Sequence, residues 1–161
     1  LGNEPALEKY MKEAPRRRDE SIVSKKMMTQ IVTMGFWLTI LSFVFLKMPF
    51  FDIFFNTEEQ KLTAYFVLFI VSALFNGFNV RDNGFGIFKG LNENTGFLKV
   101  FFTIILVQAL IVNAGLVPFL GWLGKMFSCV PFGIAGWGVV ILLAVTMIPV
   151  DLLRKLIVKS R

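Results

Sequence analysis

Eighteen consecutive residues, from Leu62 to Asn79, carry no charge and consist mostly of Phe, Val, Leu, Ile and Ala. At about 1.5 Å of rise per residue, a helix of this length crosses the hydrocarbon core of a bilayer. Three further apolar stretches of similar length lie at about residues 28–46, 97–115 and 133–150. The sequence therefore predicts an all-α, polytopic membrane protein in which a loop (residues 1–26) precedes a four-helix transmembrane domain (residues 27–161).

The composition supports a membrane protein and excludes several kinds of site. The chain is 55% hydrophobic with a mean hydropathy of +0.67, and soluble domains rarely reach these values. It has no His, which removes His-based zinc sites, Ser-His-Asp triads and His general bases. Cys129 is the only cysteine, so no internal disulfide can form. The chain starts at Leu1 without Met, which suggests a piece of a longer polypeptide, although processing would also explain it.

The basic residues lie mainly on one side of the expected membrane. Fourteen of the 17 Lys and Arg precede the first stretch, lie in or beside the middle loop, or follow the last stretch, and only three lie on the other side. By the positive-inside rule, both termini and the central loop are expected to be cytoplasmic. No aromatic residues interleave with the basic run Arg16-Arg17-Arg18-Asp19, so we expect a solvated juxtamembrane loop near anionic headgroups, with no nucleic-acid partner.

The ends of the fourth stretch are marked by proline and charge. Pro149 is expected to kink its last turn. The charged residues that begin at Asp151 and include Arg154 and Lys155 are expected to return the chain to water. On the opposite side, Trp122 suits the aromatic belt of a membrane interface.

Polar residues inside the spans are the candidate functional residues. Ser72, Asn76 and Asn79 are spaced i, i+4 and i+7, so they share one helix face, and Gln108 lies near the middle of the third span. Such residues most often form hydrogen bonds between helices, and the alternative is the wall of an ion pathway. Ala73 and Gly77 form a small-xxx-small pair that allows another helix to approach closely.

Several ordered motifs resemble the C-terminal membrane region of P-type cation-transporting ATPases, most closely the plasma-membrane-type calcium pumps. Residues 75–81, FNGFNVR, resemble that family's F-N-E-[IL]-N-[AS]-R at the cytoplasmic end of helix eight. Further similarities, in the same order as in the family, are the loop at residues 11–28, the motif at residues 87–97, Gln108 with Ile111-Val112 in helix nine, and Ile148-Pro149 near the end of helix ten.

The resemblance implies that the four spans are helices seven to ten of a ten-helix pump located in the plasma membrane. The parent would use ATP, magnesium and calcium, and its remaining transmembrane helices and cytoplasmic domains would be partners of this chain, together with the lipid bilayer. The family's phosphorylated D-K-T-G-T motif is absent from this sequence. We therefore expect no catalytic residue, cofactor site or ATP hydrolysis in this chain alone. The loop containing Arg16, Arg17, Arg18 and Asp19 would couple the spans to the cytoplasmic domains.

Two positions depart from the family pattern. Ala73 stands where reticulum-type relatives carry a calcium-binding Glu, so no metal ligand is expected at this position. Gly77 stands where the motif usually has Glu.

Two rival interpretations stay open at the level of sequence. One is a free-standing four-helix scaffold or accessory subunit. The other is a pump for Na⁺, K⁺ or H⁺, because ion identity depends mainly on helices outside this sequence.

Overall fold

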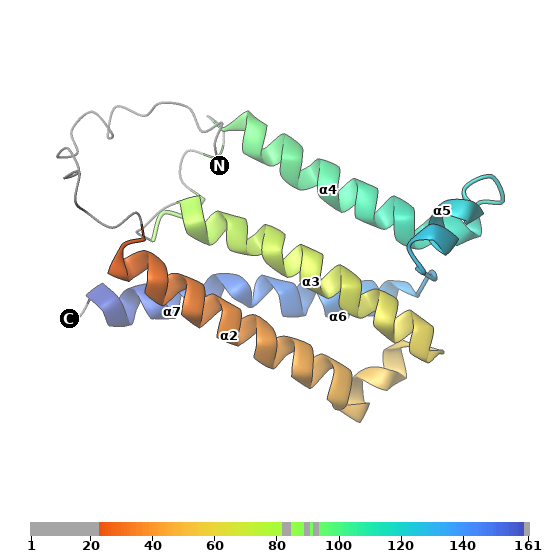
Figure 1. Cartoon of the computed structure of the whole chain (residues 1–161), viewed down its shortest axis with the longest axis horizontal. Coiled ribbons are helices and arrows are strands. Elements are labelled where there is room, and N and C mark those ends of the chain that lie inside the picture. The colour runs from red at the N-terminus through yellow and green to blue at the C-terminus, as the bar shows by residue number, and fades with distance from the viewer. Residues whose placement is uncertain (1–22, 82–84, 89–90, 92–93, 160–161) are drawn as a thin grey trace.

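The computed structural model describes residues 23–81, 85–88, 91 and 94–159, and these form helices joined by short connections (Figure 1). No strand occurs in these ranges. The elements are α2 (Lys25–Lys47), η1 (Pro49–Phe54), α3 (Glu58–Arg81), α4 (Thr95–Asn113), η2 (Ala114–Leu116), α5 (Gly121–Met126), α6 (Ile134–Val145) and α7 (Met147–Lys159). The run Arg16 to Asp19, expected to be a coupling loop, lies outside the described residues.

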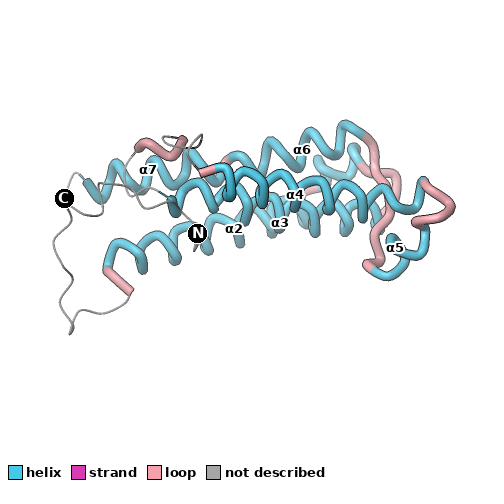
Figure 2. Tube along the Cα trace, turned by 90° about the horizontal axis from the view of Figure 1, so that it is seen from above, coloured by secondary structure: helices cyan, strands magenta, loops and turns pink. Residues whose placement is uncertain are grey.

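Four helical segments are long and apolar enough to cross a membrane, which confirms the all-α, four-span prediction. They are α2, α3, α4 extended by η2 to Leu116, and α6 together with α7 to Val158. The start of α2 and the end of α7 lie at one end of the bundle, and α5 lies at the other (Figures 1 and 2).

Local sequence explains where the first span begins and ends. The Ser24 hydroxyl accepts a hydrogen bond from the backbone N–H of Met27 at 3.2 Å, which caps the first turn of α2. Pro49 cannot continue the α-helical hydrogen bonding, and it begins the short 3₁₀ helix η1 instead.

The central element is α3, which contacts α2, α4, α6 and α7. In the apolar 18-residue stretch of α3 that could cross a membrane, 44% of the residues are buried, against 17% in the corresponding stretches of α2 and of α4. Its position between the other spans is visible in Figure 1. The residues of α3 therefore determine how the remaining spans pack.

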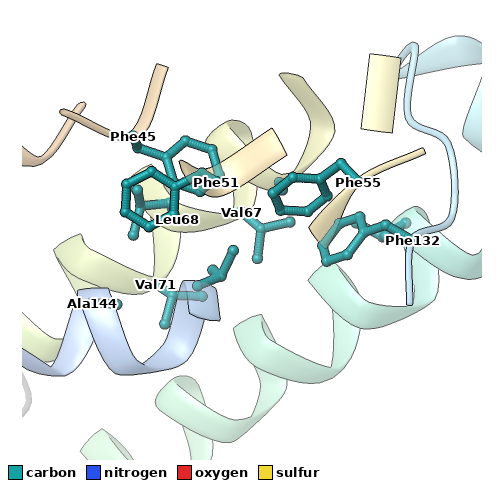
Figure 3. Packing of buried hydrophobic residues seen from close by; sticks show 11 residues of the cluster. Phe45, Phe51, Phe55, Val67, Leu68, Val71, Phe132 and Ala144 are labelled. Atoms are coloured by element: carbon teal, nitrogen blue, oxygen red, sulfur yellow. The ribbon is translucent and has the colours of Figure 1, made fainter. Parts of the chain in front are cut away.

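A phenylalanine-rich core fills the half of the bundle nearer α5. The rings of Phe45, Phe51, Phe55 and Phe132 surround Val67 and Leu68 of α3 (Figure 3). The backbone of α6 approaches this core at Gly136, where an added Cβ would lie 2.7 Å from the Phe55 ring. This close approach requires glycine, since real Cβ atoms do not come so near to other carbon atoms.

A second aromatic contact joins α3 to α4. Phe78 packs edge-on against Phe97 and Phe101, with ring centroids 4.9 and 5.1 Å apart, and the Arg81 guanidinium lies 5.0 Å from the Phe97 centroid. A Cβ on Gly77 would lie 3.4 Å from the Phe97 ring. A long side chain such as Glu, usual at this position in the family motif, would have to pass or displace that ring.

The last span is broken, and it is longer than the sequence suggested. Helix α6 ends at Val145, Thr146 forms a turn, and α7 continues to Lys159. Pro149 lies in the first turn of α7, where a missing backbone N–H costs least. The helix therefore continues past Val150, where the sequence predicts the end of the span. The break at Thr146 lies in the turn before Pro149, because Pro149 has no backbone N–H to donate to the carbonyl of Val145.

Candidate functional site

The polar face of α3 is divided between the protein interior and a groove. Ser72 and Asn79 are buried, with 0% and 1% of their surface exposed, whereas Asn76 is half-buried and Ala73 is exposed. The shared helix face that the sequence predicts is therefore directed partly toward α7 and partly outward.

Asn79 ties α3 to α7 at the point where the last span is broken. Its side-chain Nδ2 donates to the backbone carbonyl of Met147 at 2.8 Å and, more weakly, to Asn76 Oδ1 at 3.3 Å. Met147 is the first residue of α7. Because interhelical amide bonds of this kind stabilise membrane bundles, Asn79 acts here as a structural link between α3 and α7.

A buried charged cluster provides a second link between the same helices. The Asp151 carboxylate, fully buried, accepts from Arg154 Nε at 2.7 Å and lies 2.9 Å from Lys155 Nζ. Lys155 Nζ also donates to the backbone carbonyl of Asn79 at 3.1 Å. This carbonyl lies in the last turns of α3, at the negative end of the helix dipole, which favours the extra positive charge of the cluster.

The buried cluster corrects the expectation that Asp151, Arg154 and Lys155 return the chain to water. All three are buried, with Arg154 9% and Lys155 5% exposed. Buried charges persist only when they are paired and hydrogen-bonded, and the contacts with Asp151 and with Asn79 satisfy that condition. The i, i+3 and i+4 spacing from Asp151 could have indicated the pairing, although it occurs equally on solvated helices.

The break in the last span is also held from α2. The indole N–H of Trp37 donates to the Thr146 hydroxyl at 3.0 Å, and that hydroxyl donates to the carbonyl of Leu143 at 2.6 Å. Together with the bond from Asn79 to Met147, this contact places hydrogen bonds from α2 and α3 on two consecutive residues, the turn residue Thr146 and the first residue of α7. Sequence patterns did not identify Trp37 or Thr146 as a pair.

A groove of about 310 Å³ opens between α2, α3 and the start of α7. Its lining is mainly apolar, with small residues from both long helices and two amides, and consists of Met27, Gln30, Ile31, Met34, Gly35, Leu38, Ala73, Asn76, Val80 and Met147. The Nε2 atom of Gln30 is buried and has no acceptor within bonding distance. A Cβ on Gly35 would meet nothing within 4 Å. The groove therefore combines space for a neighbouring helix with the half-buried amide of Asn76, which can bond to it.

Gln108 lies apart from this arrangement, on α4. It is 4% exposed, and its Nε2 atom has no acceptor within bonding distance. Ser72 Oγ is likewise buried without a partner. The structure thus brings Asn76 and Asn79 together, whereas it shows no hydrogen bond from Ser72 Oγ or Gln108 Nε2 to either of them.

The described residues contain no group of three His, Cys, Asp or Glu able to hold a metal ion. The carboxylate of Asp151 is neutralised by Arg154 and Lys155, and Ala73 offers no oxygen atom to the groove.

Comparison with known proteins gives one consistent result. The family model described as "Cation transporting ATPase, C-terminus" matches residues 1–157. The chain is 30% identical to human plasma membrane calcium-transporting ATPase 4 over 148 residues, which cover 85% of this chain and 11% of that protein. It is 28% identical to plasma membrane calcium-transporting ATPase 2 of Oreochromis mossambicus, over 85% of this chain and 13% of the relative. Identity to the Caenorhabditis elegans protein mca-1 is 25%, over 89% of this chain and 12% of the relative.

No solved structure matches the chain. The chain spans only about a tenth of the length of the curated relatives it matches.

Proposed function

The chain belongs to the family of cation transporting ATPase C-termini, and on this premise we propose that it is the membrane support region of an ATP-driven calcium pump in the plasma membrane. Its spans would hold the transport helices of the parent, and residues 1–26, including Arg16 to Asp19, would couple them to the cytoplasmic domains. ATP, magnesium and calcium would bind to other parts of the parent. Calcium is proposed as the ion because the matched relatives are named calcium-transporting ATPases.

The observation that carries the proposal is the groove between α2 and α3. Lipid chains cannot satisfy the half-buried amide of Asn76, so this group favours a protein neighbour. Gly35 and Ala73 leave room for the backbone of such a neighbour to come close. A helix from the rest of the pump, carrying hydrogen-bonding side chains, fits these requirements.

Asn76 is proposed to be a structural hydrogen-bonder of this contact and not a calcium ligand. It accepts from Asn79, and no carboxylate is present at Ala73 to share a calcium ion with it. In the full-length protein, Asn76→Ala should shift calcium affinity by less than about tenfold, or about 1.4 kcal/mol. Complete loss of calcium activation with normal expression would instead place Asn76 in the ion site.

Filling the groove tests the proposal directly. In the full-length protein, Ala73→Leu should lower expression and calcium-dependent ATPase activity, because overpacking a helix contact costs about 1 to 3 kcal/mol. Ala135→Leu adds the same atoms at an exposed position on α6 and is the matched control. Wild-type activity of Ala73→Leu would show that no transport helix occupies the groove.

If the natural polypeptide lacks a phosphorylation motif, the chain is a free-standing membrane protein.

A further inference from the structure

Two short helices at the α5 end of the bundle expose large apolar side chains in place of a polar loop. In η1, Phe50 and Ile53 are 64% and 72% exposed. In and just before α5, Phe119, Trp122 and Met126 are 83%, 61% and 71% exposed. Loops that end in water are normally polar, so this surface calls for an apolar partner.

Glycine contacts fix the orientation of α5. Gly124 is buried, and a Cβ at this position would lie 3.3 Å from the carbonyl oxygen of Cys129 and 3.5 Å from the amide nitrogen of Gly115. The inner side of α5 therefore packs directly on backbone. Trp122 and Met126, one helical turn apart, point away from that contact, so their exposure follows from the packing of the loop.

The apolar surface of α5 continues the outer surfaces of two spans. Helix α4, which leads into this loop, exposes Leu106 and Leu110, and α6 begins with Ile134, which is 90% exposed. These spans belong to the membrane region. Figure 1 places α5 at their end, with no other described element beyond it. Continuity with the exposed apolar surface of these spans favours lipid over water or a soluble partner.

The residue types on α5 are those of a membrane interface. Trp and Lys combine a long apolar body with a polar tip, and both are frequent at the depth of the headgroups. Lys125 is the single charged residue of α5 and is exposed beside Trp122. Its ammonium group suits a headgroup phosphate, while the neighbouring rings suit acyl chains.

We propose that α5 lies in the membrane interface and binds phospholipid, with acyl chains against Phe119, Trp122 and Met126 and a headgroup phosphate at Lys125. The helix thereby anchors the connection between α4 and α6 at a fixed depth, as amphipathic interfacial helices do. The proposal depends on the four spans and not on the pump function, so either can fail without the other.

Photo-crosslinking tests the partner directly. The photoreactive residue p-benzoylphenylalanine replaces Phe119, Trp122 or Met126, one at a time, in the full-length protein in its native membrane. After irradiation, mass spectrometry of the peptide that covers the loop identifies what each position has bound. The matched control is the same replacement at Glu58, an exposed polar position at the same end of the bundle.

We expect phospholipid adducts at the three apolar positions and no such adducts at Glu58. Adducts to a polypeptide at Phe119, Trp122 and Met126 would show that a protein covers α5 and would overturn the proposal. Absence of any adduct, which means that the positions face water, would overturn it as well, as would equal lipid labelling of Glu58. The three positions are tested independently, so failure of one variant to accumulate leaves two that decide.

Discussion

At the scale of single residues, Asn79 makes the largest structural contribution of the polar face on α3. Its side chain bonds to Met147 and its backbone carbonyl accepts from Lys155, so one residue reaches α7 at two places, two turns apart along that helix. Asn76, three residues earlier, meets Asn79 and then faces the groove. Asn79 contacts α7 whereas Asn76 faces the groove, because α7 packs against only one side of α3.

Removing the Asn79 amide should destabilise the bundle. Asn79→Ala loses the bond to Met147, and double-mutant cycles in membranes value such bonds at about 0.6 kcal/mol, with an upper end near 2. Asn113→Ala is the control, since the Asn113 amide bonds to Ala109 within its own helix. The measurement is thermal unfolding of the purified variants in detergent. Equal loss for both variants would contradict an interhelical role for Asn79.

The charge of Asp151 should matter more than any exposed ion pair. Asp151→Asn removes the buried carboxylate that Arg154 and Lys155 share, and breaking a buried ion pair from one side is expected to cost about 3 to 5 kcal/mol of stability. Asp52→Asn, which breaks the exposed pair with Lys61, should cost less than about 1 kcal/mol.

An apolar replacement separates charge from packing. The triple variant Asp151→Leu, Arg154→Met and Lys155→Met should recover much of the stability that Asp151→Asn loses, because the carboxylate and both cations that contact it are removed together. Both sets are measured by unfolding in the same detergent. Stability of Asp151→Asn close to wild type would mean that the cluster is solvated.

At the scale of elements, the two glycines Gly136 and Gly138 of α6 differ in what surrounds them. Gly136 faces Phe55 and Phe132 at distances that exclude a Cβ, whereas Gly138 on the same helix has nothing within 4 Å. The two positions are one half-turn apart and point to opposite sides of α6. A substitution therefore changes helix propensity equally at both positions, whereas only Gly136 contacts the core.

Alanine at these two glycines should have opposite effects. Gly136→Ala should destabilise by about 1 to 3 kcal/mol, because the new methyl group forces the Phe55 and Phe132 rings to move. Gly138→Ala should be neutral or stabilising by up to about 1 kcal/mol, because alanine favours the helix. Unfolding midpoints of the two variants provide the comparison. A harmless Gly136→Ala would show that α6 does not approach the phenylalanine core this closely.

At the scale of the whole molecule, sidedness follows from charge. The fourteen-to-three distribution of Lys and Arg predicts that the ends of α2 and α7 near the termini face the cytoplasm, with η1 and α5 on the outside. In the structure α5 lies at the opposite end of the bundle from the start of α2 and the end of α7 (Figure 2), and which end faces the cytoplasm stays a prediction.

Cysteine labelling in intact cells tests the orientation. Cys129 is first replaced by Ala, although burial, which also raises the pKa of its thiol, already slows its reaction. A cysteine at Thr57 should react with a membrane-impermeant reagent, whereas cysteines at Val23 and Phe85 should react only after permeabilisation. Labelling of Phe85→Cys in sealed cells would mean that the orientation is the reverse of the predicted one or that the chain does not cross the membrane four times.

From the amino-acid sequence alone one could predict the number of spans, their approximate positions and the helix face shared by Ser72, Asn76 and Asn79. These properties are local: the length of an uncharged run decides whether it can cross a bilayer, and helical spacing decides which side chains share a face. The same reasoning assigned Asp151, Arg154 and Lys155 to water, because their spacing is the same on a solvated helix and on a buried one.

The burial of this charged cluster is a property of the folded bundle and could not be predicted from the sequence. Its burial depends on the carbonyl of Asn79, which lies 76 residues from Lys155 in sequence. The break at Thr146, held by Trp37, and the groove between α2 and α3 arise in the same way. Each depends on how helices far apart in the sequence pack together, because a buried polar group needs a hydrogen-bond partner and here another helix supplies one.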